Sequence, residues 1–286
     1  MPNFNLPLKR ILLFTASFLI NWLVSAQDLE QTYQSGKANF SLGNYQVAAL
    51  ELERVIFFGA GKYDAEIFEM LGQIHQIEGD FNRSASCFSQ ASDYATTPEG
   101  FLRNKIAQAS NLILADKAML AKIELLGLND NIPDTFQVKQ YFLLGISEFS
   151  VGSFEESRLA FKRAISISNP ASITRIDSLF ETLKNIKHPN PKTARLLSMI
   201  LPGTGQFYSG DVKNGLNSLL LTGGFITVGL MVATNYSLID AVISIIPWVQ
   251  RYYIGGFKRA GNIAKDRLLQ KQDEIYQQIL LSFNEL

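Results

Sequence analysis

The chain has few of the residues that catalytic and metal sites most often use. Its 286 residues include one cysteine, Cys87, and two histidines, His75 and His188. One cysteine cannot form an internal disulfide, and the two histidines lack metal-ligand spacing. Cys87 stands beside Phe88 in a helical pattern, where a small buried thiol is ordinary packing. Carboxylates are numerous but none is singled out as a catalytic pair, so we expect no enzyme activity, no metal and no cofactor.

Charge is also scarce, because only 18% of the residues are charged while 47% are hydrophobic. The net charge of zero conceals an acidic excess in Gln27–Asn190 and a basic excess in Pro191–Leu286. An acidic first part offers no basic surface for nucleic acid. The apolar content is high for a soluble protein, and we therefore expect membrane lipid, but no nucleic acid, among the partners.

The N-terminal residues have the pattern of a secretory signal peptide. Lys9 and Arg10 precede an apolar run, Ile11–Val24, and Val24-Ser25-Ala26 resembles a cleavage site. We expect cleavage after Ala26. A retained signal anchor is the alternative, but the run is short for the about 20 residues of a membrane span. Cys87 lies too far away to be lipid-modified there, so membrane attachment requires another segment.

Short motifs with a central glycine recur along the chain. They are Leu42-Gly43-Asn44-Tyr45, Glu78-Gly79-Asp80-Phe81 and Val151-Gly152-Ser153-Phe154. Their spacing indicates a period of about 36 residues and predicts one further turn near Ala115-Asp116. Small residues recur about two helical turns before each of these glycines, namely Gly36, Gly72 and Gly145. Small or apolar residues also recur about three turns after each glycine, namely Val55, Ala91 and Ala164.

This pattern resembles the tetratricopeptide repeat over residues 27–168. The resemblance implies stacked helix pairs that share a core, with the first helix of each pair lining a concave surface for a protein or peptide. Only three of the four units match well, since Phe101–Leu128 lacks the turn glycine and the small residue. The family's groove positions correspond here to Tyr33, Lys37, Phe40, Glu66, Glu69, Gln73, Gln76, Lys139, Phe142 and Phe149. The alternative for the aromatic residues is packing between repeats.

Two apolar segments follow a proline-containing linker, Asn185–Pro191. Gly215–Ala233 carries no charge and has the length of a membrane-spanning helix, and Leu238–Ile254 is mostly apolar and ends in aromatic residues typical of a membrane interface. The short connection between them predicts an antiparallel transmembrane hairpin. Asp240 is near the start of the second segment, where an interfacial position is expected. Beyond Arg259, charges interrupt a helical apolar pattern, which predicts an amphipathic C-terminal helix.

A proline- and glycine-rich motif stands just before the hairpin. It resembles the P-G-x-G-Q-x-Y-x-G pattern of uncharacterised bacterial membrane proteins, over about Arg195–Ala260, and this resemblance implies membrane placement but no defined chemistry. We interpret it as a structural turn. A phosphate-binding loop is disfavoured because Gly210 is followed by Asp211 instead of lysine. The motif residues are Pro202, Gly203, Gly205, Gln206, Tyr208, Gly210 and Gly215.

The number of membrane crossings is left open by two conflicting rules. Export of the repeats and two crossings would place Lys213, Arg251, Lys258 and Arg259 outside the cytoplasm, against the positive-inside tendency. A third, short crossing by the proline-broken segment Ala194–Tyr208 would place them inside, and we favour this arrangement, with the repeats and the C-terminal tail on opposite sides of the membrane.

The sequence thus predicts an all-α protein. Its expected parts are a signal peptide (1–26), a tetratricopeptide-like solenoid (27–168), a helix and proline linker (169–192), a membrane domain (193–259) and an amphipathic C-terminal helix (260–286). We expect an exported scaffold, anchored in a bacterial inner membrane with its repeats in the periplasm, that binds a protein or peptide. The alternative is a component of a transport, insertion or assembly complex in which the hairpin carries the function.

Overall fold

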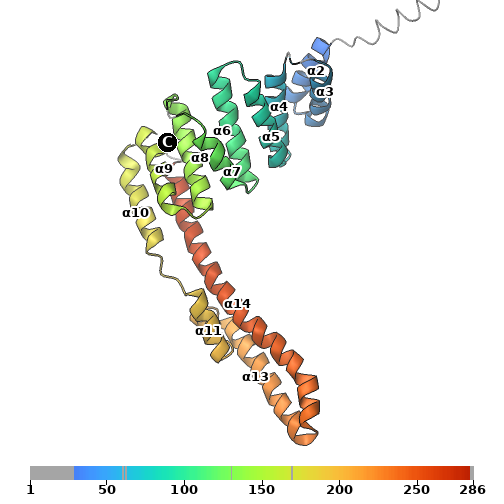
Figure 1. Ribbon diagram of the computed structural model, residues 1–286, viewed down its shortest axis with the longest axis vertical. Helices are drawn as coiled ribbons and strands as arrows, with labels where there is room; N and C mark the ends of the chain where they lie inside the picture. The colour runs from blue at the N-terminus through green and yellow to red at the C-terminus, as the bar shows by residue number, and fades with distance from the viewer. Residues whose placement is uncertain (1–28, 60, 62, 130, 169, 284–286) are drawn as a thin grey trace, which may run out of the picture. The chain divides into compact units, whose positions relative to one another are not determined.

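The computed structural model describes residues 29–59, 61, 63–129, 131–168 and 170–283, and this part of the chain contains helices and no β-strand (Figure 1). The predicted all-α class is confirmed. The expected signal peptide, residues 1–26, lies outside the described residues. The chain divides into two compact units, Met1–Pro170 and Ala171–Leu286.

In unit 1, successive helices pack as pairs and follow one another from blue to green in Figure 1. The pairs are α2 (Leu29–Ser41) with α3 (Tyr45–Phe58), α4 (Asp64–Ile77) with α5 (Phe81–Asp93), α6 (Pro98–Leu114) with α7 (Ala118–Leu126), and α8 (Asp134–Ser150) with α9 (Phe154–Ser168).

The turns inside these pairs use left-handed backbone conformations. Gly43, Gly79 and Gly152 have φ values of 79°, 79° and 84°, a region that is accessible to glycine at little cost. The turn predicted near Ala115-Asp116 is confirmed, since α6 ends at Leu114 and α7 begins at Ala118. Asp116 takes the left-handed position there, with φ 59°. Aspartate tolerates this region better than most residues, which explains how the turn forms without glycine.

Close packing within the pairs explains the other recurring glycines. A Cβ atom on Gly36 or Gly72 would lie 3.0 Å from the side chain of Leu52 or Phe88, and one on Gly145 would lie 2.7 Å from the ring of Phe161. In two pairs a serine also fastens the second helix to the first: the hydroxyls of Ser84 and Ser157 donate to the carbonyls of Gly72 and Gly145, at 2.7 and 2.8 Å.

The short 3₁₀ helix η1 (Pro170–Ser172) spans the boundary between the units, which falls after Pro170. Helix α10 (Ile173–Lys184) is the first α-helix of unit 2. Helices α11 (Pro191–Ile200), α12 (Thr204–Tyr208), α13 (Val212–Asn235) and α14 (Leu238–Leu281) follow. The expected linker ends one residue early, because Pro191 is the first residue of α11. Proline is well suited to that position, and the Asn190 side chain accepts hydrogen bonds from the backbone N–H groups of Lys192 and Thr193.

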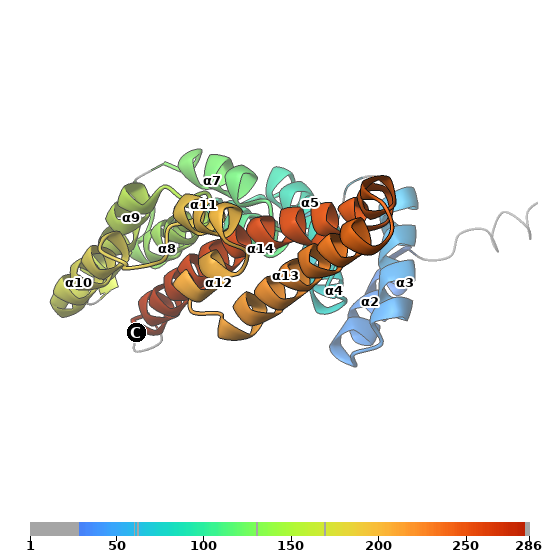
Figure 2. The same ribbon diagram turned by 90° about the horizontal axis from the view of Figure 1, so that it is seen from below.

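Helices α13 and α14 pack against each other as a helical hairpin, and Figure 2 shows α12 next to both of them. Phe225 of α13 stacks on Trp248 and Tyr252 of α14, with ring centroids 6.0 and 5.2 Å apart. Helix α13 is long and apolar enough to cross a membrane, and only 6% of its most apolar stretch is buried. No other helix in the described ranges meets this criterion, and the segment Leu238–Ile254 is therefore not identified as a second span.

The expected boundary between hairpin and C-terminal helix is absent. Helix α14 continues through Arg259 and Ala260 to Leu281 and includes Pro247 in its interior. Just beyond that boundary, Ala260 and Ala264 are fully buried with Ala194 of α11.

The segment Ala194–Tyr208 does not form the single helix that a third membrane crossing would use. Helix α11 ends at Ile200 and α12 begins at Thr204, with Gly203 between them at φ 94°. Ten helical residues extend about 15 Å, half of the about 30 Å hydrocarbon core. Pro202 and Gly203 break the segment into two short helices, so a third crossing here would not be one continuous helix, and the third crossing itself stays a prediction.

Candidate functional site

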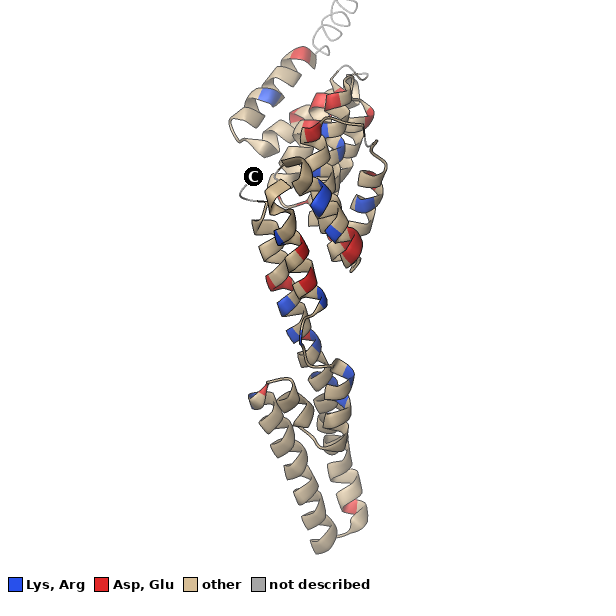
Figure 3. Ribbon diagram, turned by 90° about the vertical axis from the view of Figure 1, so that its left-hand side faces the viewer, with Lys and Arg blue, Asp and Glu red and all other residues tan. Residues whose placement is uncertain are grey.

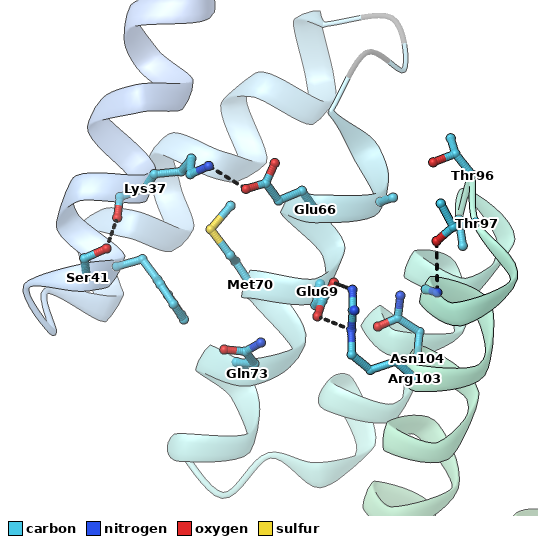
Figure 4. Close-up of a pocket in the computed structure, with 14 residues that line it drawn as sticks. Lys37, Ser41, Glu66, Glu69, Met70, Gln73, Thr96, Thr97, Arg103 and Asn104 are labelled. Carbon is cyan, nitrogen blue, oxygen red and sulfur yellow. Dashed lines mark hydrogen bonds and ion pairs between the residues drawn. The ribbon is translucent and has the colours of Figure 1, made fainter. Parts of the chain in front are cut away.

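A groove of about 540 Å³ lies between α2, α4 and the start of α6 in unit 1 (Figure 4). Its size is within the range of small-ligand and peptide pockets. Five of the expected binding residues line it: Lys37, Phe40, Glu66, Glu69 and Gln73.

A polar network joins α2 to α4 along one wall. Lys37 Nζ lies 2.6 Å from Glu66 Oε1, and the Tyr33 hydroxyl donates to the other oxygen of the same carboxylate. Burial opposes ionisation of Glu66, but the hydrogen bonds from Lys37 and Tyr33 outweigh it and lower the pKa of this carboxyl. Burial, with the Glu66 carboxylate as the next cause, raises the pKa of Tyr33 to about 12. At neutral pH the network therefore contains a carboxylate, an ammonium group and a neutral phenol.

A second ion pair joins α4 to α6. Arg103 donates from Nε and a terminal nitrogen to the two oxygens of Glu69, each at 3.0 Å, as Figure 4 shows. Bidentate pairs of this kind fix the geometry of both partners. Lys37 and Arg103 thus balance the charges of Glu66 and Glu69, and the groove wall is polar without a strong excess of either sign.

Asn104 is the buried polar residue of the groove whose hydrogen bonding is incomplete. It is 2% exposed, yet its Oδ1 has no hydrogen-bond partner. A buried carbonyl oxygen without a partner costs about 1–3 kcal/mol relative to a satisfied one. A ligand N–H group in the groove would remove this cost.

The remaining expected residues have other environments. Tyr33 is 3% exposed and belongs to the hydrophobic core, where it stacks on Tyr63 with ring centroids 4.1 Å apart. Phe40 lines the groove but also packs edge-on against Tyr45, at 5.9 Å. Gln76 is exposed and outside the groove lining.

On α8, Lys139, Phe142 and Phe149 lie away from this groove. The two phenylalanines make edge-on ring contacts within the fourth pair, with Phe161 at 6.0 Å and Phe154 at 5.0 Å. These two aromatic residues therefore make packing contacts within one pair, whereas the alternative from the sequence was packing between repeats.

Arg103 and Asn104 were missed by sequence reasoning because their unit lacks the glycine signature. The repeat period was a usable signal, since the turn at Ala115-Asp116 assigns the preceding helix to the groove-lining layer. Glu69 and Arg103 are 34 residues apart, close to one period.

In unit 2, the glycines of the motif allow three close approaches of the chain. A Cβ atom on Gly203 would lie 2.4 Å from the Gly215 carbonyl oxygen. One on Gly205 would lie 1.8 Å from the Ala194 carbonyl oxygen, and one on Gly215 would lie 2.7 Å from the Phe207 ring. Real Cβ atoms do not come this close, so the motif holds α11, α12 and α13 together at positions that exclude side chains.

Gln206 completes this arrangement. It is 1% exposed, its Oε1 accepts from the Ser198 hydroxyl at 2.7 Å, and its Nε2 donates to the Gly256 carbonyl at 2.9 Å. Tyr208 accepts a hydrogen bond from the backbone N–H of Asn190 at 3.2 Å. Gly210 has φ 78° and ends the turn after α12. In the structure the motif thus forms a junction in which close packing and hydrogen bonds join neighbouring helices, and a purely structural role for it stays a prediction.

The described residues contain no group of three or more His, Cys, Asp and Glu side chains placed to hold a metal ion. Burial raises the pKa of the Cys87 thiol to about 11, so it is protonated at neutral pH and a weak nucleophile. His75 contacts Glu78 at 3.3 Å on the surface of α4.

No protein-family model matches this chain, and no curated protein matches it either.

Proposed function

We propose that this chain is a membrane-anchored scaffold whose tetratricopeptide-like unit holds an extended segment of a protein partner in the groove between α2, α4 and α6. The observation that carries this proposal is the unpartnered Oδ1 of Asn104 in a groove of about 540 Å³. An extended peptide presents a backbone N–H group that this oxygen can accept, and Gln73 lies on the same groove.

The glycine turns and the close helix pairs support the resemblance to tetratricopeptide repeats. The groove's ion pairs hold the three lining helices at fixed spacing before a partner arrives. Such preorganisation favours binding because less conformational entropy is lost.

Membrane anchoring is proposed from the apolar, largely unburied helix α13 and from the cations grouped near one end of the hairpin. We propose two crossings, by α13 and the first part of α14, with export directed by residues 1–26. Recovery of the full-length protein in membranes after a carbonate wash, with an N-terminus at Gln27, is the expected result. Release into the wash would contradict the anchor.

A photo-cross-linking residue at position 73 in the full-length protein tests the groove. The control places the same residue at Gln90, which is exposed on α5 and outside the groove. We expect one partner segment, mapped by mass spectrometry, to cross-link at position 73 alone. Replacing Asn104 with leucine, of similar size, should weaken that capture about three- to tenfold, the value of one lost hydrogen bond. Equal capture from both positions, or no effect of Asn104→Leu, would refute the groove.

The second candidate is a hairpin-centred role in a transport, insertion or assembly complex. It is favoured by a cavity between α13 and α14 whose lining includes Arg251 and Arg259. Expression of residues 27–190 alone separates the two functions. If the repeats bind the partner, this fragment still captures it, and if the hairpin does so, capture is lost.

A further inference from the structure

The cavity between α13 and α14 has a volume of about 260 Å³ and lies wholly within unit 2. Its lining residues include Arg251 and Arg259, both partly exposed to solvent, from α14, and Asn217 and Ser218 from α13. Leu221 adds apolar surface. In Figure 3 the length of the hairpin is almost free of charge, which sets this cluster apart from its surroundings.

Two glycines of α14 leave the space between the arginines open. Gly255 has no atom within 4 Å of the position that a Cβ would take, and both Gly255 and Gly256 line the cavity. A Cβ on Gly256 would instead lie 2.7 Å from Ser218 Oγ. The cavity is therefore open because residues 255 and 256 are glycines without side chains.

The cavity's polar groups are only partly used by the protein, since Gln206 bonds to Ser198 and Gly256 while others have no partner. Ser218 Oγ is buried without a hydrogen-bond partner. Among the residues the structure describes, no ion pair within 4.0 Å includes Arg251 or Arg259. The neighbouring carboxylate of Asp211 caps α13, accepting from the backbone and side-chain nitrogens of Asn214 at 3.0 and 2.6 Å; these hydrogen bonds lower its pKa, with smaller contributions from the charges of Arg259 and Arg267.

Guanidinium, amide and hydroxyl donors around one small hollow suit a tetrahedral oxyanion. Arginine binds phosphate in a bidentate fashion, and each phosphate oxygen accepts several hydrogen bonds. A carboxylate has two oxygens and would leave more of these donors without a partner. The volume is below that of typical drug-sized pockets, which limits the occupant to a small group.

We propose that this cavity binds a phosphate group, carried by an anionic phospholipid or by a soluble phosphate ester. A lipid source rests on the membrane placement proposed above. Leu216 and Leu220 of α13 are 49% and 63% exposed near the cavity-lining residues and offer apolar surface to acyl chains.

Full-length, delipidated protein in detergent can be tested with two phosphate probes. Dioleoyl phosphatidylglycerol is compared with dioleoylglycerol, which has the same chains without phosphate, by native mass spectrometry. sn-Glycerol 3-phosphate is titrated by calorimetry as the soluble source.

Two pairs of variants separate the cavity from general charge and from misfolding. Arg251→Gln/Arg259→Gln removes the cavity cations, and Lys213→Gln/Lys258→Gln removes two exposed lysines near the same end of the hairpin that are outside the cavity. Gly255→Leu fills the hollow, and Gly224→Leu is its control on α13, since nothing lies within 4 Å of a Cβ at either position. Leucine favours helix over glycine, so both glycine variants are expected to fold.

We expect the double arginine variant and Gly255→Leu each to lose about tenfold or more in affinity for at least one phosphate probe. Both control variants should change by less than about threefold, the usual scale for exposed charges. Binding of phosphatidylglycerol alone assigns a lipid headgroup, and binding of both probes assigns the phosphate group irrespective of its carrier. Binding of glycerol phosphate alone supports a phosphate site that takes a soluble ester. If the protein is also released in the carbonate wash, the proposed membrane anchor is refuted while the phosphate site stands. Absence of binding, or equal losses in the arginine and lysine variants, would overturn the proposal.

Discussion

The turn between α4 and α5 allows the backbone conformation of one residue to be tested alone. Gly79 has φ 79°, and no atom lies within 4 Å of the position of an added Cβ. The backbone is held by hydrogen bonds from the N–H of Gly79 to Gln76 and of Asp80 to His75, at 3.1 and 2.9 Å. Gly79→Leu therefore introduces no clash, and its effect should come from left-handed strain.

That strain costs roughly 1–2 kcal/mol for a residue with a side chain. For a protein of 150–250 residues, each kcal/mol shifts the melting temperature by about 2–4 °C, which predicts a decrease of roughly 2–8 °C. Gly79→Asn should lose less, because asparagine tolerates this region better. Thermal and urea unfolding of the repeat unit measure both effects, and the urea m-value should stay constant.

Gln76→Leu is the matched control, since it adds an apolar side chain at an exposed position one turn earlier with ordinary helical geometry. It should change the melting temperature little. Equal stability of Gly79→Leu and the wild type, or equal losses for leucine at positions 76 and 79, would refute the assignment of left-handed strain to this turn.

Three further predictions concern other parts of the chain. Gly205→Ala should destabilise unit 2 by about 1–3 kcal/mol or more, because its Cβ would lie 1.8 Å from the Ala194 carbonyl oxygen; an unchanged unfolding curve of the full-length protein would contradict this packing. Because the pKa of Glu66 is lowered in the folded protein, its contribution to folding stability is complete above the ordinary value of 4.5 and is lost as pH falls through the lower folded pKa. The wild type should therefore lose more stability than Glu66→Gln between about pH 5 and pH 3. Parallel melting-temperature profiles of the two proteins would count against the network. Burial raises the pKa of Cys87 to about 11, so this thiol should react with iodoacetamide at pH 8 far more slowly than a free thiol, and denaturant should remove the difference. Fast labelling of the native protein would contradict its burial.

Local patterns were the reliable part of the sequence prediction. The period of about 36 residues located the turn at Ala115-Asp116 even though it lacks glycine. The groove was located in part: Lys37, Glu66 and Gln73 line it, whereas Lys139, Phe142 and Phe149 do not. Position within a repeat tells which face of a helix a residue occupies, but not which neighbouring helix comes near enough to enclose a cavity.

The membrane end was predicted less accurately. Apolar composition indicated the hairpin, and Pro202 and Gly203 mark the break between α11 and α12 locally, but the sequence pattern did not indicate that α14 runs unbroken from Leu238 to Leu281. Ala260 and Ala264 of α14 are buried with Ala194, which lies more than sixty residues earlier in the chain, and such a contact leaves no local pattern.

By itself, the sequence determined the helical class, the pairs of helices and their turns, because glycine backbone freedom and the spacing of small residues act within one repeat. Only the tertiary structure decided that Arg103 pairs with Glu69 beside the unpartnered oxygen of Asn104, and that Gln206 joins Ser198 to Gly256. These arrangements depend on hydrogen bonds and close packing between segments far apart in sequence, and such contacts leave no local periodic pattern.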